Sequence, residues 1–445
     1  MLARPMPTSQ ITILSLLCLT LVATGCRKEP ALESANPPAA TSPATPAPAV
    51  QADTAADVAA LEAAGFVLTK NSAGNVVELS IGGSQNITDV LSHLSGVPNV
   101  EKATFTGPGI DDNGMENLSA FTRIKRLDFT DSAIADATLA TVGKLDTLEA
   151  LFLRRTGVTN EGLSQLAGLK KLRAIDLRNS NIGDAGMDAL VQIKSLADIQ
   201  LEKSKVTDAG LVKLAPLKLK SINFNYCTTI SNATMKVLGK MPTLESLQAD
   251  YSKVNDEGMK ELAGLRNLKR IRVRGCDVTG TGLPYVKDNP KLARFELRDS
   301  SLDAKGLEIL SAMPQITFLD MSECRLAKPD DIAKLGKLKN LTYLGLWETK
   351  TNDETVAAFG DLTNLNELNL KSASVGDDSL PTLMKLTNLK RLNVAGTLFS
   401  DDGFRQLGSL PKLQYLNVAN TSIGFDVIDE LAESREDLEV VEFEN

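Results

Sequence analysis

A repeat of 24 residues constrains this chain more than any other feature of its sequence. From Val76 onward, apolar residues recur in the spacing L-x-x-L-x-L, and eleven of the fifteen intervals between successive blocks are 24 residues long. The blocks begin at residues 76, 100, 124, 148, 172, 196, 219, 244, 268, 292, 316, 341, 365, 389, 413 and 438. A fixed period of this size predicts a solenoid, in which stacked units bury a core that no single unit could form.

Within each block the apolar spacing changes from alternation to helical spacing. The L-x-x-L-x-L part predicts a short strand, and a Thr, Asn or Asp then leads into segments such as "TNEGL" and "TDAGL", which suits a helix N-cap. Leucines at three-residue spacing follow, as at Leu163, Leu166 and Leu169. Each block is therefore predicted to contain a strand, a turn and about two helical turns.

The pattern resembles the leucine-rich repeat, and it is similar to bacterial variants of the ribonuclease-inhibitor and cysteine-containing subtypes, with their T-D-x-G-L helix start. The resemblance covers residues 76–445. It implies an α/β fold: a right-handed solenoid, shaped as a horseshoe or arc, with a parallel concave sheet, short convex helices and about sixteen repeats. A departure lies eight residues after each block start, where the family usually has Asn or Cys and this chain mostly has Ser, Thr or Cys.

The stretch "IRVRGCDVTGTGL" (271–283) looks like a phosphate loop or a reactive thiol, but the repeat explains its residues. Cys276 aligns with Cys227 and Cys324, so all three are predicted to be buried, inert thiols. Gly282 aligns with the glycine of the other helix starts, where close packing is expected, and the Gly-x-x-x-x-Gly-Lys pattern of a phosphate loop is missing.

The first residues are predicted to be removed or anchored rather than folded. The apolar run 11–25 is too short for a comfortable membrane span but suits a signal peptide over residues 1–25. It ends in "LVATGC", which resembles a bacterial lipobox and implies that Cys26 carries the lipid. By the sorting rule of bacterial lipoproteins, Arg27 after the cysteine favours the outer membrane. The expected location is therefore the cell envelope. An ordinary secretory leader and a short anchor helix are the alternatives.

Two further segments precede the repeats. Residues 26–53 are rich in Pro and Ala and predict an extended tether. Residues 54–75 predict an N-terminal cap made of a short amphipathic helix and a hairpin. At the other end, the last strand "LEVVEFEN" carries Glu439, Glu442 and Glu444, and charge on an open edge discourages strand addition by other molecules.

Composition argues against several classes of protein. The 445 residues include 48 Lys and Arg against 56 Asp and Glu, so the chain lacks the basic character of a nucleic-acid binder. His93 is the only histidine, which leaves no histidine pair for a metal, and no nucleophile is paired with a base. The chain is predicted to be no enzyme and to need neither metal nor cofactor.

Residues whose type is not dictated by the repeat are the candidates for a functional role. Residues two, four and six after each block start should face the concave side, and equivalent residues of neighbouring blocks should lie about 4.8 Å apart. Five arginines and three aromatic residues gather there, and interface hot spots are enriched in Trp, Tyr and Arg. The predicted partner-binding residues are Arg270, Arg272, Arg274, Arg294, Arg298, Phe318, Tyr343 and Trp347.

The sequence therefore predicts a lipid-anchored, non-enzymatic binding module whose partner is a protein, a peptide or an anionic glycan. Two alternatives remain. The arginines form a solvated ladder with Asp250, Glu296 and Asp320 while the aromatic residues merely pack on one another, or the protein is a structural, self-associating envelope scaffold with no ligand on its concave face.

Overall fold

A computed structural model describes residues 51–443. The predicted signal peptide, the lipidation site Cys26 and the tether up to residue 50 lie outside these described residues. In the part described, no helix is both long and apolar enough to cross a bilayer.

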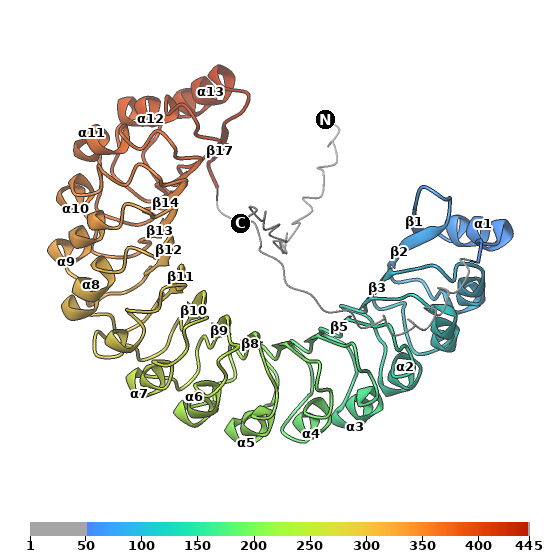
Figure 1. The fold of residues 1–445 in the computed structure, drawn as a ribbon. Helices are drawn as coiled ribbons and strands as arrows, with labels where there is room; N and C mark the ends of the chain where they lie inside the picture. Colours follow the sequence, from blue (N-terminus) through green and yellow to red (C-terminus); the bar gives the residue numbers. More distant parts are fainter. Residues whose placement is uncertain (1–50, 444–445) are drawn as a thin grey trace, which may run out of the picture. The chain divides into compact units, whose positions relative to one another are not determined.

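The strands form one sheet in which each strand pairs with the next along the chain. The first pair, β1 with β2, is antiparallel, and the fifteen pairs from β2 to β17 are parallel. The strands are β1 Val67–Lys70, β2 Val76–Gly82, β3 Lys102–Thr106, β4 Arg126–Asp128, β5 Ala150–Phe152, β6 Ala174–Asp176, β7 Asp198–Gln200, β8 Ser221–Asn223, β9 Ser246–Gln248, β10 Arg270–Arg272, β11 Arg294–Glu296, β12 Phe318–Asp320, β13 Tyr343–Gly345, β14 Glu367–Asn369, β15 Arg391–Asn393, β16 Tyr415–Asn417 and β17 Glu439–Val441. The sheet lines the inner side of an open arc (Figure 1).

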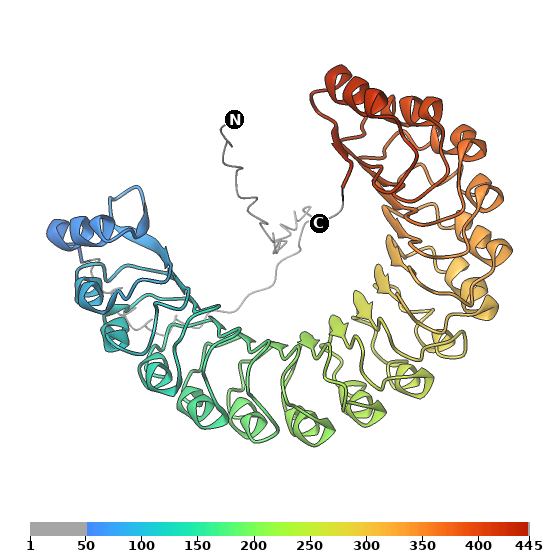
Figure 2. The ribbon, with the colours of Figure 1, turned by 180° about the vertical axis from the view of Figure 1, so that it is seen from behind.

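Short helices cover the outer side of the arc, as both views show (Figures 1 and 2). The α-helices are α1 Ala55–Ala63, α2 Asp136–Val142, α3 Asn160–Leu163, α4 Gly186–Leu190, α5 Asp208–Leu211, α6 Asn232–Leu238, α7 Asp256–Lys260, α8 Ala304–Ser311, α9 Pro329–Ala333, α10 Asp353–Ala357, α11 Leu380–Leu383, α12 Asp401–Gly408 and α13 Phe425–Ser434. The 3-10 helices are η1 Thr88–Gly96, η2 Met115–Ala120, η3 Ser164–Leu166, η4 Val212–Leu214, η5 Leu283–Tyr285, η6 Lys334–Lys337 and η7 Asp377–Ser379. The solenoid predicted from the repeat, with its parallel inner sheet and outer helices, is confirmed.

The core runs along the whole arc between sheet and helices. The apolar residues of the L-x-x-L-x-L motifs are buried in all blocks between the first and the last, as Leu268, Ile271 and Val273 are in the block that contains β10. The leucine stripe of each helix faces them, so every repeat completes the core of its neighbours.

A ladder of hydroxyl and thiol groups follows the strands. The hydroxyl eight residues after the block start donates to a backbone carbonyl three residues earlier, for example from Ser132 to Phe129 at 2.7 Å and from Thr349 to Leu346 at 2.7 Å. The residue just before this position has positive φ in most blocks, and in one block it is Gly275 at +60°. A Cβ on Gly275 would lie 2.3 Å from the Tyr251 ring, which explains the glycine within "IRVRGCDVTGTGL".

Carboxylates at the helix starts join successive repeats. Asp184 accepts hydrogen bonds from the backbone N–H and the hydroxyl of Thr207 in the next repeat, both at 2.7 Å. A Cβ on Gly210 would lie 2.3 Å from this carboxylate, and one on Gly282 would lie 2.5 Å from Asp256. The close-packing role predicted for these glycines is confirmed: the Asp of one repeat occupies the space that the Gly of the next leaves free.

The N-terminal segment covers the first repeat strand. Helix α1 precedes a hairpin in which β1 pairs antiparallel with β2. His93 in η1 lies with its Nδ1 atom 2.7 Å from Asp57 Oδ1, which links α1 to the first repeat. His93, the single histidine, therefore joins α1 to η1.

The register of the last repeat differs from the prediction. A block start at residue 438 would bury Val441 and Phe443, but β16 and β17 pair Leu416 with Val440, and Phe443 is 74% exposed. A shift of one residue turns each side chain of a strand to the other face. Arg435, just after α13, fixes the last block to the turn before β16 by donating to the carbonyls of Leu410 and Leu413, at 2.6 and 2.7 Å.

Candidate functional site on the concave face

The strands place the predicted arginines on one surface because alternate residues point to opposite sides of the sheet. On β10, Arg270 and Arg272 flank the buried Ile271, and Arg274 follows at the same alternation. Parallel pairing sets Arg270 beside Arg294, the first residue of β11. Arg298 lies four residues further along that block, so all five guanidiniums belong to two neighbouring repeats. We call these five residues the arginine cluster.

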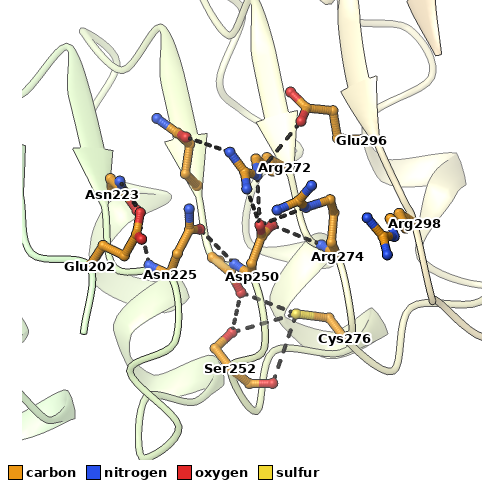
Figure 3. Close-up of polar contacts among 12 residues, drawn as sticks. Glu202, Asn223, Asn225, Asp250, Ser252, Arg272, Arg274, Cys276, Glu296 and Arg298 are labelled. Carbon is orange, nitrogen blue, oxygen red and sulfur yellow. Dashed lines mark hydrogen bonds and ion pairs between the residues drawn. The ribbon is translucent and has the colours of Figure 1, made fainter. Parts of the chain in front are cut away.

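A fully buried carboxylate lies beneath one part of the arginine cluster (Figure 3). Asp250 has no exposed surface, and it pairs with Arg272 Nη2 at 2.6 Å and with Arg274 Nε at 2.7 Å. The backbone N–H of Arg274 also donates to it, at 3.0 Å. A buried carboxylate needs such partners because an uncompensated buried charge is strongly unfavourable.

A second carboxylate, Glu296, holds the other part of the arginine cluster. It accepts from Arg294 Nε at 2.6 Å and pairs with Arg270 Nη2 at 2.8 Å, and it is itself 4% exposed. Burial alone would raise the pKa of Glu296, but Arg270, Arg294 and Arg272 together hold that pKa below its usual range. Arg298 pairs with Glu323 in the next repeat.

Charge is therefore arranged in two layers. The carboxylates of Asp250 and Glu296 lie at the bottom, whereas the side chains of Arg294 and Arg298 are 40% and 30% exposed. The five guanidiniums pair with the carboxylates of Asp250, Glu296 and Glu323. Asp320 accepts from Ser322 and interacts with the charge of Arg274 without a direct ion pair, so five cations and four acids leave a formal charge of +1 (5 − 4). A ligand would meet guanidinium groups first, but their long-range field is largely cancelled.

The aromatic residues lie against these cations. The rings of Phe318 and Tyr343 stack with centroids 3.9 Å apart, and the guanidinium of Arg294 lies 3.6 Å from the Phe318 centroid. Burial, followed by the charges of Asp320 and Glu367, raises the pKa of Tyr343, so its hydroxyl stays protonated at physiological pH.

Trp347 lies between two cations contributed by other repeats. The Arg298 guanidinium is 4.3 Å from the indole ring and Lys371 Nζ is 5.0 Å from it. Within residues 51–443, the buried indole Nε1 atom has no hydrogen-bond acceptor. A buried donor of this kind is usually satisfied by an ordered water molecule.

Amide side chains border the arginine cluster, and sequence reasoning did not single them out. Asn225 is fully buried and its Oδ1 atom accepts from the Asp250 backbone N–H at 2.8 Å, while its Nδ2 atom has no partner in the described part of the chain. Gln248 lies 3.5 Å from Arg272 Nη1. The only signal in the sequence is that these amides occupy the same alternating positions as the arginines.

The three cysteines of the described region are buried, as predicted. Cys276 Sγ donates to the Ala249 carbonyl at 3.1 Å. Burial raises the pKa of Cys276, and it raises that of Cys324 to about 11. These thiols therefore stay protonated near neutral pH and are poor nucleophiles.

Comparison with known proteins agrees with the repeat architecture. A family model described as a leucine-rich repeat region matches residues 108–328 and 310–442, which is most of the chain. Among functionally curated proteins, no match was found.

Several solved structures are similar in fold. An internalin from Listeria monocytogenes is 20% identical, with a TM-score of 0.48, over 81% of this chain and 94% of that one. A leucine-rich repeat protein of Leptospira interrogans is 15% identical, with a TM-score of 0.47, over 82% and 89%. The leucine-rich repeat ectodomain of a plant membrane receptor kinase from Arabidopsis thaliana, in complex with Casparian strip integrity factor 2, is 14% identical, with a TM-score of 0.45 over 84% of this chain. The match spans about half (51%) of that plant protein.

Proposed function

The chain belongs to the leucine-rich repeat family, and we propose that it is a non-enzymatic binding module whose concave face, between Arg270 and Trp347, holds a protein or peptide partner. The observation that carries this proposal is the arrangement at β11 to β13. The half-buried guanidiniums of Arg294 and Arg298 lie on the rings of Phe318 and Trp347. Arginine and aromatic side chains that are already held in place lose little entropy when a partner binds them.

The near neutrality of the surface favours a protein or peptide over an anionic glycan. A polyanion gains most of its affinity from uncompensated cations, whereas each guanidinium here already has a carboxylate partner. Directional hydrogen bonds remain available from outer guanidinium nitrogens, and aromatic edges remain available for apolar side chains. A partner of mixed polar and apolar chemistry uses both.

We further propose that the module is tethered to the cell envelope. In this view residues 1–25 are a signal peptide, Cys26 carries the lipid, and residues 26–53 separate the solenoid from the membrane, with the outer membrane as the destination. Mass spectrometry of the purified protein should find an acylated N-terminal cysteine at position 26, and Cys26→Ala should release the protein from membranes. An unmodified Cys26, or unchanged membrane association of the variant, would refute the tether.

A structural scaffold remains the second candidate, because each of the five guanidiniums has an internal carboxylate partner. Capture from envelope extract distinguishes the two. The double variant Arg294→Ala with Arg298→Ala should lose the proteins that the parent chain retains, while Arg325→Ala, a 75% exposed arginine used as control, should retain them. Identical capture by all three chains would favour the scaffold.

A further inference from the structure

Strand β17 is the last strand of the described residues. Strand β17 pairs with β16 on one side, and within residues 51–443 no strand pairs with its other edge. The opposite end differs, because β1 and α1 cover the first repeat strand (Figures 1 and 2). Unpaired strand edges present backbone N–H and C=O groups on which another strand can pair.

Large apolar side chains surround this open edge. Phe425 is 73% exposed and Phe443 is 74% exposed. With Ile423, Ile428 and Glu442 they line a cavity of about 480 Å³. Exposed apolar surface with a polar rim marks an interaction site in a soluble domain.

The position of Phe425 shows that the last helix departs from the repeat. In the preceding blocks the equivalent residues are Asp353, Asp377 and Asp401, and each accepts from a backbone N–H of the next repeat at 2.8 to 3.0 Å. Phe425 replaces that carboxylate at the point where no further repeat follows in the described chain. A phenylalanine ring cannot accept these backbone hydrogen bonds, and here it is mostly exposed.

Most of the chain's net charge is concentrated at the same end. Residues 426–443 contain eight acids and one base, Arg435, a formal charge of −7 (1 − 8), against −8 for the whole chain. Arg435 is already engaged by the carbonyls of Leu410 and Leu413 and by Asp437. Asp426, Asp429, Glu430 and Glu433 line a groove along α13. The end therefore favours positively charged partners.

We propose that the C-terminal end of the solenoid binds a basic polypeptide segment in an extended conformation. The segment pairs with the free edge of β17, places an apolar side chain beside Phe425 and Phe443, and sets Lys or Arg side chains against Glu439, Glu442 and the acids of α13. Adding a strand to an open sheet edge supplies affinity through the backbone and specificity through alternate side chains. The acidic residues that discourage strand addition by neutral or acidic segments therefore select a basic one.

Charge argues against a second copy of the chain as the occupant. Two C-terminal ends would bring their acids together, and like charges across an interface are unfavourable. The N-terminal end offers no compensation, because residues 51–80 contain Asp53, Asp57, Glu62 and Glu78 against a single base, Lys70.

The test uses the full chain and a defined probe. A fluorescently labelled ten-residue peptide that alternates Lys with Val, with one central Phe, should bind in an anisotropy titration and should bind more weakly as salt rises. Phe443→Ser should weaken binding about tenfold, as should Glu439→Lys with Glu442→Lys, because none of these side chains is part of the buried core. Val67→Ser, at a 67% exposed residue of the edge strand β1, is the control and should bind the peptide as the parent does.

Four outcomes of the titration would each overturn the proposal. They are a lack of binding, equal binding of a peptide in which Glu replaces Lys, binding that Phe443→Ser leaves unchanged, and binding that Val67→Ser weakens as much as Phe443→Ser does. Sedimentation of the chain alone should show no association through this end. A self-association that Phe443→Ser abolishes would identify a second copy as the occupant and would also contradict the proposal.

Discussion

The carboxylate of Asp250 lies beneath Arg272, with 2.6 Å between its Oδ2 atom and Arg272 Nη2, and it has no exposed surface of its own. It comes from the block that contains β9, while Arg272 belongs to β10. One buried acid thus fixes a guanidinium of the neighbouring repeat. The arginine cluster is consequently part of the architecture of the sheet as well as a surface.

Asp250→Ala is expected to lower the free energy of unfolding by about 3 kcal/mol, because it leaves Arg272 and Arg274 partly buried without their carboxylate. Urea denaturation followed by circular dichroism measures the change. Asp361→Ala is the control, because Asp361 is an exposed partner of Lys339 and exposed ion pairs contribute little to stability. Equal losses for the two variants would show that the buried network does not stabilise the fold.

Two glycine substitutions test the packing between repeats. Gly210→Ala should destabilise by about 1–3 kcal/mol, since its Cβ would lie 2.3 Å from the Asp184 carboxylate. Gly168→Ala introduces the same methyl group where no atom lies within 4 Å, so it should be neutral or slightly stabilising. Thermal unfolding compares the two variants, and a lower Tm for Gly168→Ala than for Gly210→Ala would contradict this packing.

Glu296→Gln tests the electrostatics of the surface through pH. Arg270, Arg294 and Arg272 lower the pKa of Glu296 in the folded state, so this carboxylate contributes stability above its unfolded pKa of about 4.3. The parent chain should be more stable than Glu296→Gln at pH 7, and the difference should shrink as pH falls through the lowered folded pKa. Denaturation of both chains between pH 7 and pH 3 measures this difference in the free energy of unfolding. A difference that grows toward acid pH would contradict the lowered pKa of Glu296.

Thiol accessibility tests the ladder that contains the cysteines. Burial raises the pKa of Cys227, Cys276 and Cys324, so alkylation by iodoacetamide at pH 8 should be slow in the folded chain and rapid in denaturant. Peptide mass spectrometry reports each residue separately. Rapid modification of native Cys276 would show that its thiol is reactive after all.

The sequence predicted the interior of the molecule well, because a buried position is defined by its own repeat. Ile271 faces the core and Arg272 faces the concave side for reasons contained in one block. Asp250 and Glu296 could be named from the sequence as partners of the arginines, but the individual pairings could not, since only packing selects Arg272 and Arg274 for Asp250. Phe443 was predicted to be buried but is 74% exposed, because β17 pairs with β16 in a register one residue away from the one that the repeat predicts.

Site-directed cross-linking tests most directly whether the concave face binds the partner. A photoreactive amino acid at Asn369, on β14 beside the predicted surface, is compared with one at Lys305, on the exposed side of α8. After irradiation in envelope extract, binding at the concave face predicts a discrete cross-linked product from position 369 that is absent with Arg294→Ala and Arg298→Ala, and none from position 305. Products of equal yield from both positions, or from position 305 alone, would contradict it.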